Sequence, residues 1–133
     1  MAAETFSFDL VTPARLLASE EAEMVVVPGG DGDFGVLPGH APLLSTLRPG
    51  TLAIYEDDAV SERLFVEGGF AEVKDNRCVV LAEEAVAVAE ITPETVTERL
   101  EEAQRKVAAA ETESEKEDAA HELKVAEAMQ AAR

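Results

Sequence analysis

The sequence predicts an α+β fold in two segments: an antiparallel β-sandwich of about ten strands in residues 1–89 and an antiparallel two-helix hairpin in residues 90–133. All eight glycines and all six aromatic residues lie at or before Phe70, whereas alanine fills ten of the last 44 positions. Apolar residues alternate with period two in the first segment and recur at helical spacing in the second. Because glycine and proline punctuate short strands and alanine favours helix, the composition changes where the fold should change.

Short stretches of alternating apolar and polar residues run through the first segment. FSFDL begins the series, and in EEAEMVVV the residues Ala22, Met24 and Val26 are expected to share one face. Further strands are predicted in LAIYE, RLFVE, FAEVK, RCVVLA and EAVAVA. Turn signals rich in glycine, proline and aspartate separate them at residues 28–32, 48–50, 57–58, 68–69 and 75–76. Nine or ten strands at this spacing favour two sheets packed face to face.

The second segment has the start signals of two helices. Thr92 is predicted to cap the first helix, with Pro93 in the first turn, where a missing N–H costs nothing. The first helix should bury a narrow stripe formed by Val96, Leu100, Ala103 and Val107.

A polar break at residues 111–113 separates the two helices. Ser114 to Glu117 form a capping-box pattern, so Ser114 is expected to cap the second helix. That helix should bury Ala119, Leu123 and Ala126. Because these residues bury little apolar area, we expect the hairpin to be the mobile part of the chain.

Charge and cysteine content narrow the possible partners and location. The formal net charge is −17 and the pI is about 4.3, which argues against nucleic acid or an anionic lipid surface as a partner. Cys78 is the only cysteine, so an internal disulfide is excluded and a reducing cytoplasm is expected. No apolar run approaches the roughly 20 residues of a membrane-spanning helix, and the first residues lack the features of a signal or transit peptide.

The residues that carry enzyme chemistry form no familiar pattern. His40 and His121 lie far apart without metal-ligand spacing, and nucleophile-elbow and phosphate-loop motifs are missing from the sequence. Cys78 lies within an apolar strand, where a buried structural role is favoured. Residues 30–35 resemble a calcium loop only superficially, because they lack its alternating acidic ligands and closing glutamate. We therefore expect no catalytic site, no metal site and no cofactor.

The segment GVLPGHAPLL, residues 35–44, combines two prolines with a glycine and should form a rigid loop. Val36, Leu37, Leu43 and Leu44 are expected to anchor its two ends. Two interpretations remain open. The loop either crosses between sheets, with His40 capping a local backbone group, or presents a surface to a partner.

A longer run, GDFGVLPGHAPLLSTLRPG, closely resembles the hallmark of the epsilon subunits of bacterial F-type ATP synthases, the counterparts of the mitochondrial delta subunit. A second block of that family is similar to GGFAEV at residues 68–73 and VVLA at residues 79–82. The resemblance covers nearly the whole chain. It implies a ten-stranded sandwich with a helical hairpin, and a non-catalytic subunit of the central stalk that binds the gamma subunit and the c-ring and couples proton-driven rotation to ATP synthesis. It also implies a peripheral place at the cytoplasmic side of the bacterial inner membrane, without direct membrane insertion.

Two groups of positions in this chain match positions that the family uses for contacts with other subunits. The positions that match the family's ring-facing connection are Gly29, Gly30, Asp31, Gly32 and Asp33. Asp33 would there face basic or amide groups of the ring, although a solvated turn is the alternative. The positions that match the block associated with gamma and ring contacts are Pro38, Gly39, His40 and Pro42. These could instead be required for the shape of the loop.

In many members of this family the helical hairpin extends into the alpha/beta catalytic head and arrests ATP hydrolysis, and in some it folds down on ATP. Those members carry an Asp-x-x-Arg-Ala motif in the first helix, which is missing here. Residues 90–133 hold 12 acidic and 6 basic side chains, so an acidic partner or a phosphate would be repelled. We expect weak or absent ATP binding and weak inhibition. The rival hypothesis is a stand-alone sandwich adaptor whose helix pair docks another partner.

Overall fold

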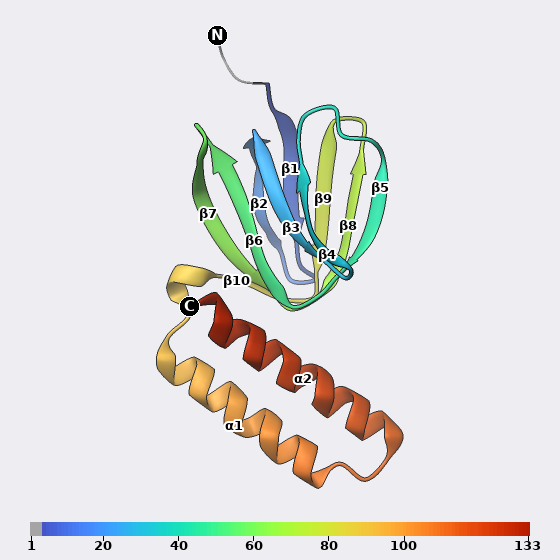
Figure 1. The fold of residues 1–133 in the computed structure, drawn as a ribbon, viewed down its shortest axis with the longest axis vertical. Coiled ribbons are helices and arrows are strands. Elements are labelled where there is room, and N and C mark those ends of the chain that lie inside the picture. Colours follow the sequence, from blue (N-terminus) through green and yellow to red (C-terminus); the bar gives the residue numbers. More distant parts are fainter. Residues whose placement is uncertain (1–3) are drawn as a thin grey trace.

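The computed structural model describes residues 4–133 (Figure 1). Ten strands are followed by a short 3-10 turn, Val88–Glu90, and by two helices, α1 (Pro93–Ala109) and α2 (Glu113–Ala132). The strands are β1 (Phe6–Val11), β2 (Leu16–Ala22), β3 (Met24–Gly29), β4 (Gly32–Val36), β5 (Leu43–Leu47), β6 (Gly50–Glu56), β7 (Ala59–Val66), β8 (Gly69–Lys74), β9 (Arg77–Ala82) and β10 (Ala85–Ala87). The predicted fold class, a sandwich followed by a helix pair, is confirmed.

The ten strands form one hydrogen-bonded sheet that folds over on itself. Their order is β10-β7-β6-β3-β5-β8-β9-β1-β2, with β4 paired to the other side of β3. A single residue pair, Gly29 opposite Leu47, joins β3 to β5 where the sheet turns from one layer to the other. One pairing differs from the expected antiparallel arrangement, because β1 and β9 run parallel. These strands are far apart in the sequence, so no hairpin fixes their relative direction.

The sandwich core lies between the two layers. Phe6, Phe8 and Leu10 of β1 are buried, as their alternation predicts. The expectation that Ala22, Met24 and Val26 share one face is wrong. Glu23 forms a bend that ends β2 at Ala22, and β3 then starts in the opposite register, with Val25 and Val27 fully buried. A shift of one residue exchanges the two faces of a strand.

The predicted loop at residues 35–44 is shorter than expected, because β4 continues to Val36 and β5 begins at Leu43. Val36 is buried and Leu43 packs against the core. The other two predicted anchors are wrong, since Leu37 is 53% exposed and Leu44 is 69% exposed. The strand pleat points Leu44 outward, and the turn after β4 carries Leu37 away from the core.

Two hairpin turns place non-glycine residues in the left-handed region. Asp57 and Asp58 join β6 to β7 with φ angles of 52° and 63°, and Asp75 and Asn76 join β8 to β9 with φ angles of 51° and 60°. Aspartate and asparagine tolerate these angles best, and two such residues match the twist of the flanking strands. Both turns lie where the sequence predicts them.

The first helix begins as expected, and the second does not. Thr92 caps α1 by accepting a hydrogen bond from Thr95 N at 3.1 Å. The cap of α2 is Thr112, not Ser114. The Thr112 hydroxyl accepts from Glu115 N at 3.1 Å and donates to the Glu115 carboxylate at 3.1 Å. Threonine followed three residues later by glutamate also satisfies the capping-box pattern, so the helix starts earlier.

The helix pair packs against the end of the sandwich through a second apolar cluster. Phe65, Ile91, Val96, Val125 and Met129 form its buried centre. Of the stripe predicted on α1, Val96 and Ala103 are buried and Leu100 is half-buried, whereas Val107 is 45% exposed. Ala119 and Ala126 of α2 are buried as expected, and Leu123 is half-buried.

Candidate functional site

The two groups of site residues predicted from the sequence lie at opposite ends of the sandwich (Figure 1). The turn from Gly29 to Asp33 joins β3 to β4 at the end near the helices, and the loop at residues 37–42 joins β4 to β5 at the far end. Strand β4 separates them, because it starts in the turn and ends at Val36 beside the loop. The structure therefore does not bring the two groups together into one site.

The β3–β4 turn is packed tightly against its neighbours. Gly30 N donates to Thr46 O at 2.8 Å. A Cβ atom at Gly29 would lie 2.7 Å from the Gly32 carbonyl oxygen, and one at Gly30 would lie 2.6 Å from the Thr46 hydroxyl. A side chain at Gly29 would force the backbone of the turn to move, and one at Gly30 would force the Thr46 side chain to turn away. The turn thus presents a fixed shape at the surface.

Arg48, for which the sequence predicts no specific partner, holds this turn in place. Its guanidinium donates to the Gly29 carbonyl at 2.7 Å and pairs with the Asp33 carboxylate. Asp33 is thereby paired within the chain, and Asp31 remains an exposed carboxylate at the tip of the turn. Arg48 and Asp33 lie 15 residues apart, so the local sequence does not predict that they form an ion pair.

The far-end loop is held by its own backbone and by Asn76. His40 N donates to Leu37 O at 3.1 Å, which closes a turn with Gly39 at φ 78°. Asn76 accepts from Gly39 N at 2.9 Å and donates to Thr5 O at 3.1 Å. The His40 ring lies 2.7 Å from Ala41 O through Nδ1. This geometry favours the interpretation in which His40 caps a local backbone group.

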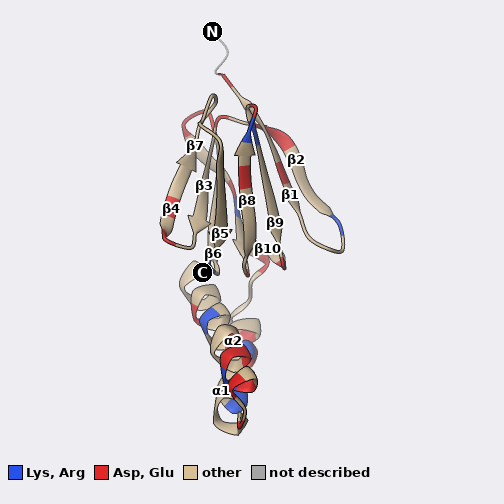
Figure 2. Cartoon of the chain, turned by 90° about the vertical axis from the view of Figure 1, so that its right-hand side faces the viewer, with Lys and Arg blue, Asp and Glu red and all other residues tan. Residues whose placement is uncertain are grey.

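An apolar surface that was not predicted from the sequence lies on the outer face of β8, β9 and β1. Figure 2 shows where these three strands lie in the sandwich. Phe70 and Leu81 are both 54% exposed and face each other across the β8–β9 pair. Leu81 in turn lies opposite Val11 of β1, and Pro13 follows in the next connection. These residues line a shallow pocket of about 320 Å³. We call Val11, Pro13, Phe70 and Leu81 the outer-face patch.

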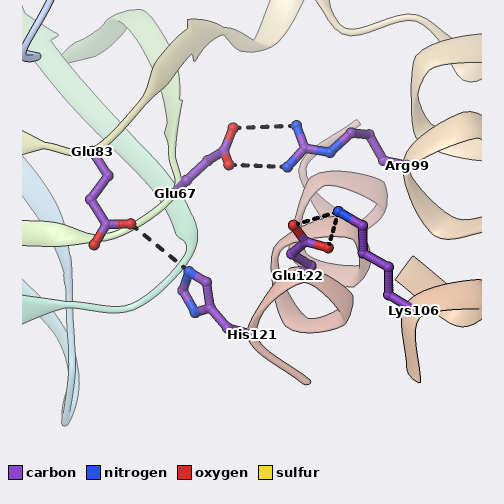
Figure 3. A network of polar contacts seen from close by, with 6 residues as sticks. All are labelled: Glu67, Glu83, Arg99, Lys106, His121 and Glu122. Carbon is purple, nitrogen blue, oxygen red and sulfur yellow. Dashed lines mark hydrogen bonds and ion pairs between the residues drawn. The ribbon is translucent and has the colours of Figure 1, made fainter. Parts of the chain in front are cut away.

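Polar contacts fasten the helix pair to the sandwich (Figure 3). Arg99 of α1 donates to both carboxylate oxygens of Glu67, at 3.0 Å and 3.3 Å. The hydrogen bonds to Glu67 and the nearby carboxylates raise the pKa of Arg99, which keeps its charge firmly in place. His121 of α2 lies 3.9 Å from Glu83. Together with the second apolar cluster, these contacts hold the hairpin in a folded position.

Cys78 is buried, and burial raises the pKa of its thiol to about 12. A thiol with this pKa stays protonated and is a poor nucleophile. This agrees with the buried structural role that the sequence predicts for Cys78. Across residues 4–133, His, Cys, Asp and Glu side chains do not gather into groups of three that could hold a metal ion. Within the same range, neither helix has the length and apolar character needed to cross a membrane.

Comparisons with known proteins agree with this architecture. The family described as "ATP synthase, Delta/Epsilon chain, beta-sandwich domain" matches residues 5–88. The ATP synthase epsilon chain of Rhodospirillum rubrum is 54% identical over 131 residues, which cover 98% of each chain. The epsilon chain of Paramagnetospirillum magneticum is 48% identical over 130 residues, again 98% of each chain.

Solved structures extend the similarity to the arrangement in space. A chain in the Euglena gracilis mitochondrial ATP synthase structure (OSCP/F1/c-ring, rotational state 1) superposes with a TM-score of 0.80 at 28% identity, over 96% of this chain and 81% of that one. A chain in the Tetrahymena thermophila central stalk/c-ring structure shares the fold, with a TM-score of 0.71 at 18% identity. With a family match over most of its length and relatives that span both segments, the chain belongs to the ATP synthase epsilon chain family, as a non-catalytic subunit.

Proposed function

We propose that the chain is a central-stalk subunit of a bacterial proton-translocating F-type ATP synthase and links the gamma subunit to the c-ring, so that proton-driven rotation is coupled to ATP synthesis. The outer-face patch is the observation that carries this proposal. The names of the similar proteins, which include central stalk and c-ring assemblies, support it. In this role the subunit stays peripheral to the inner membrane, on its cytoplasmic side, and is held there by the complex.

The outer-face patch is the proposed contact with gamma. Phe70, the second residue of β8, and Leu81, the second-to-last residue of β9, each leave more than half of their surface in water. Neighbouring large apolar side chains exposed together are typical of protein interfaces, and aromatic residues supply much of the binding energy there. A rigid sheet also loses little conformational entropy when it docks.

The β3–β4 turn is the proposed contact with the c-ring. Arg48 and the two tightly packed glycines, Gly29 and Gly30, fix its shape, and Asp31 projects a free carboxylate toward a polar partner surface. Asp33 serves the turn itself through its pair with Arg48. Because the ring can meet only one end of a rigid sandwich, we propose a shape-holding role for the loop residues Pro38, Gly39, His40 and Pro42.

The hairpin is proposed to inhibit ATP hydrolysis weakly and to bind ATP weakly or not at all. The pocket between α1 and α2 has a volume of about 330 Å³ and is lined by Glu115, Asp118 and Glu122, with Lys106 as its single cation. Nucleotide phosphates would be repelled there. Any contact with the alpha/beta head requires this acidic hairpin to leave its folded position. Isothermal titration calorimetry that detects micromolar ATP binding would contradict the proposal of weak or absent ATP binding.

The test of the main proposal is size-exclusion binding to a bacterial catalytic head, ideally from a close relative, prepared with and without gamma. We expect co-elution only when gamma is present. Leu81→Thr should weaken this binding, whereas Val60→Thr is the control, because Val60 is a half-buried apolar residue of β7, which is far from β8 and β9 in the sheet order. Binding that does not require gamma would favour the stand-alone adaptor instead. Equal binding by the two variants would remove the outer-face patch from the interface.

A further inference from the structure

A pocket of about 500 Å³ opens at the far end of the sandwich, between the start of β3 and the ends of β4 and β6. Its apolar and aromatic lining comes from Met24, Leu37, Pro38 and Tyr55. Three carboxylates surround it, those of Glu4, Glu23 and Asp58. Among the described residues that line it, none is lysine or arginine. Neither the outer-face patch nor the β3–β4 turn contributes a residue to this pocket, which therefore goes beyond the proposed function.

The walls of the pocket are fixed before any partner arrives. Asp57 and Asp58 occupy the left-handed turn between β6 and β7, and Asp57 N donates to the Glu23 carboxylate. On the other side, the turn that carries Leu37 is closed by its own backbone hydrogen bond from His40. Because both walls are held by hydrogen bonds, a ligand would lose little binding energy to ordering them.

We propose that this far-end pocket binds an arginine side chain presented by a protein partner. The three carboxylates concentrate negative potential over a small area, so a cation is the complementary ligand. Arginine fits better than lysine, because its flat guanidinium can lie against the Tyr55 ring and still donate to carboxylates at its edge. Its aliphatic stem would cover the apolar surface of Met24 and Leu37.

The experiment is an NMR titration of the full-length ¹⁵N-labelled chain with the peptide acetyl-Leu-Arg-Leu-amide at low salt. The comparison ligand replaces arginine by citrulline, which keeps the shape and loses the charge. The arginine peptide should shift the backbone amides of residues 23–24, 37, 55 and 58 and should bind about fivefold more tightly than the citrulline peptide. Equal affinity of the two peptides would overturn the proposal.

Because the whole chain is acidic, a second comparison separates this pocket from general attraction. Asp58→Asn removes one carboxylate, and asparagine is suited to the left-handed φ of 63° at that position. Asp75→Asn makes the same change at a left-handed φ of 51° in the β8–β9 turn, outside the pocket. We expect Asp58→Asn to weaken arginine-peptide binding about threefold and Asp75→Asn to leave it unchanged. Equal effects of the two variants, or shifts spread over other acidic surfaces, would show diffuse attraction and overturn the proposal.

Discussion

Arg99 of α1 and Glu67, in the connection after β7, form a two-pronged ion pair that joins the helix pair to the sandwich, with N···O distances of 3.0 Å and 3.3 Å. Glu67 has only 16% of its side chain exposed, so the pair is partly shielded from water. Charged hydrogen bonds of this two-pronged kind fix orientation as well as distance. The pair therefore sets the angle at which the hairpin meets the sandwich.

Replacing Arg99 should loosen that joint. We expect Arg99→Gln to weaken the docking of the hairpin on the sandwich by about 1 kcal/mol, because Glu67 loses its partner. Hydrogen exchange followed by mass spectrometry should report it as faster exchange in α1 and α2, with unchanged protection in β1 and β9. Arg105→Gln, an exposed change on the same helix, is the control. If both variants exchange alike, the pair does not hold the hairpin.

The start of α2 gives a second prediction. Thr112→Ala should destabilise α2 by about 1 kcal/mol, because it removes the hydroxyl that accepts from Glu115 N. Ser114→Ala, two residues away and within the helix, should have almost no effect. Helix content by circular dichroism during urea unfolding would distinguish the two. The reverse order would restore Ser114 as the cap.

A third prediction concerns acid stability. Glu20 of β2 has its pKa raised from the usual 4.5, first by burial and then by the nearby carboxylates of Glu62 and Glu56. A carboxyl whose pKa is higher in the folded chain opposes folding when ionised, and this cost disappears below pH 4.5, the ordinary value.

Glu20→Gln should therefore raise the Tm by about 2 °C near neutral pH and leave it unchanged at about pH 3. The neighbouring exposed Glu21 provides the control variant, Glu21→Gln, which makes the same change of charge on the exposed side of β2. Thermal unfolding at the two pH values is the measurement. A gain of the same size at both would mean that Glu20 acts by packing and not by charge.

The β3–β4 turn supplies a fourth prediction. Arg48→Gln should free the Gly29 carbonyl and the Asp33 carboxylate, so amide exchange at residues 30–32 should quicken. Assembled with gamma and a c-ring, the variant should bind the ring less tightly than wild type. Arg63→Gln, at an exposed position of β7, changes the net charge by the same amount as Arg48→Gln and serves as the control. If amide exchange in the turn quickens but ring binding is unchanged, the shape of the turn is not required for ring binding.

Local sequence rules account for most of the fold. Alternation predicts the inward side of β1, and paired acidic or amide residues predict both left-handed turns. The register of β3 could not be predicted in the same way, because apolar residues occupy every position from Met24 to Val27 and the bend at Glu23 leaves no compositional mark.

The candidate sites were harder to predict, because they depend on pairings between distant residues. Asn76 holds the far-end loop by accepting a hydrogen bond from Gly39, which lies 37 residues earlier in the chain, and no sequence motif connects these two positions. Alternation shows that Phe70 and Leu81 point away from the sandwich core, but it does not show that they meet and remain uncovered. The burial of Val125 and Met129 was missed because α2 contacts both α1 and the sandwich, which widens its buried face beyond one stripe.

The parallel pairing of β1 with β9 has a consequence for synthesis on the ribosome. Phe8 lies opposite Cys78, so the first strand cannot complete its place in the sheet until about 70 more residues have been made. Until then Phe6, Phe8 and Leu10 have only β2 beside them and must stay partly exposed as the chain emerges. The nascent chain should therefore be most prone to aggregation, and most dependent on chaperones, just before β9 leaves the exit tunnel.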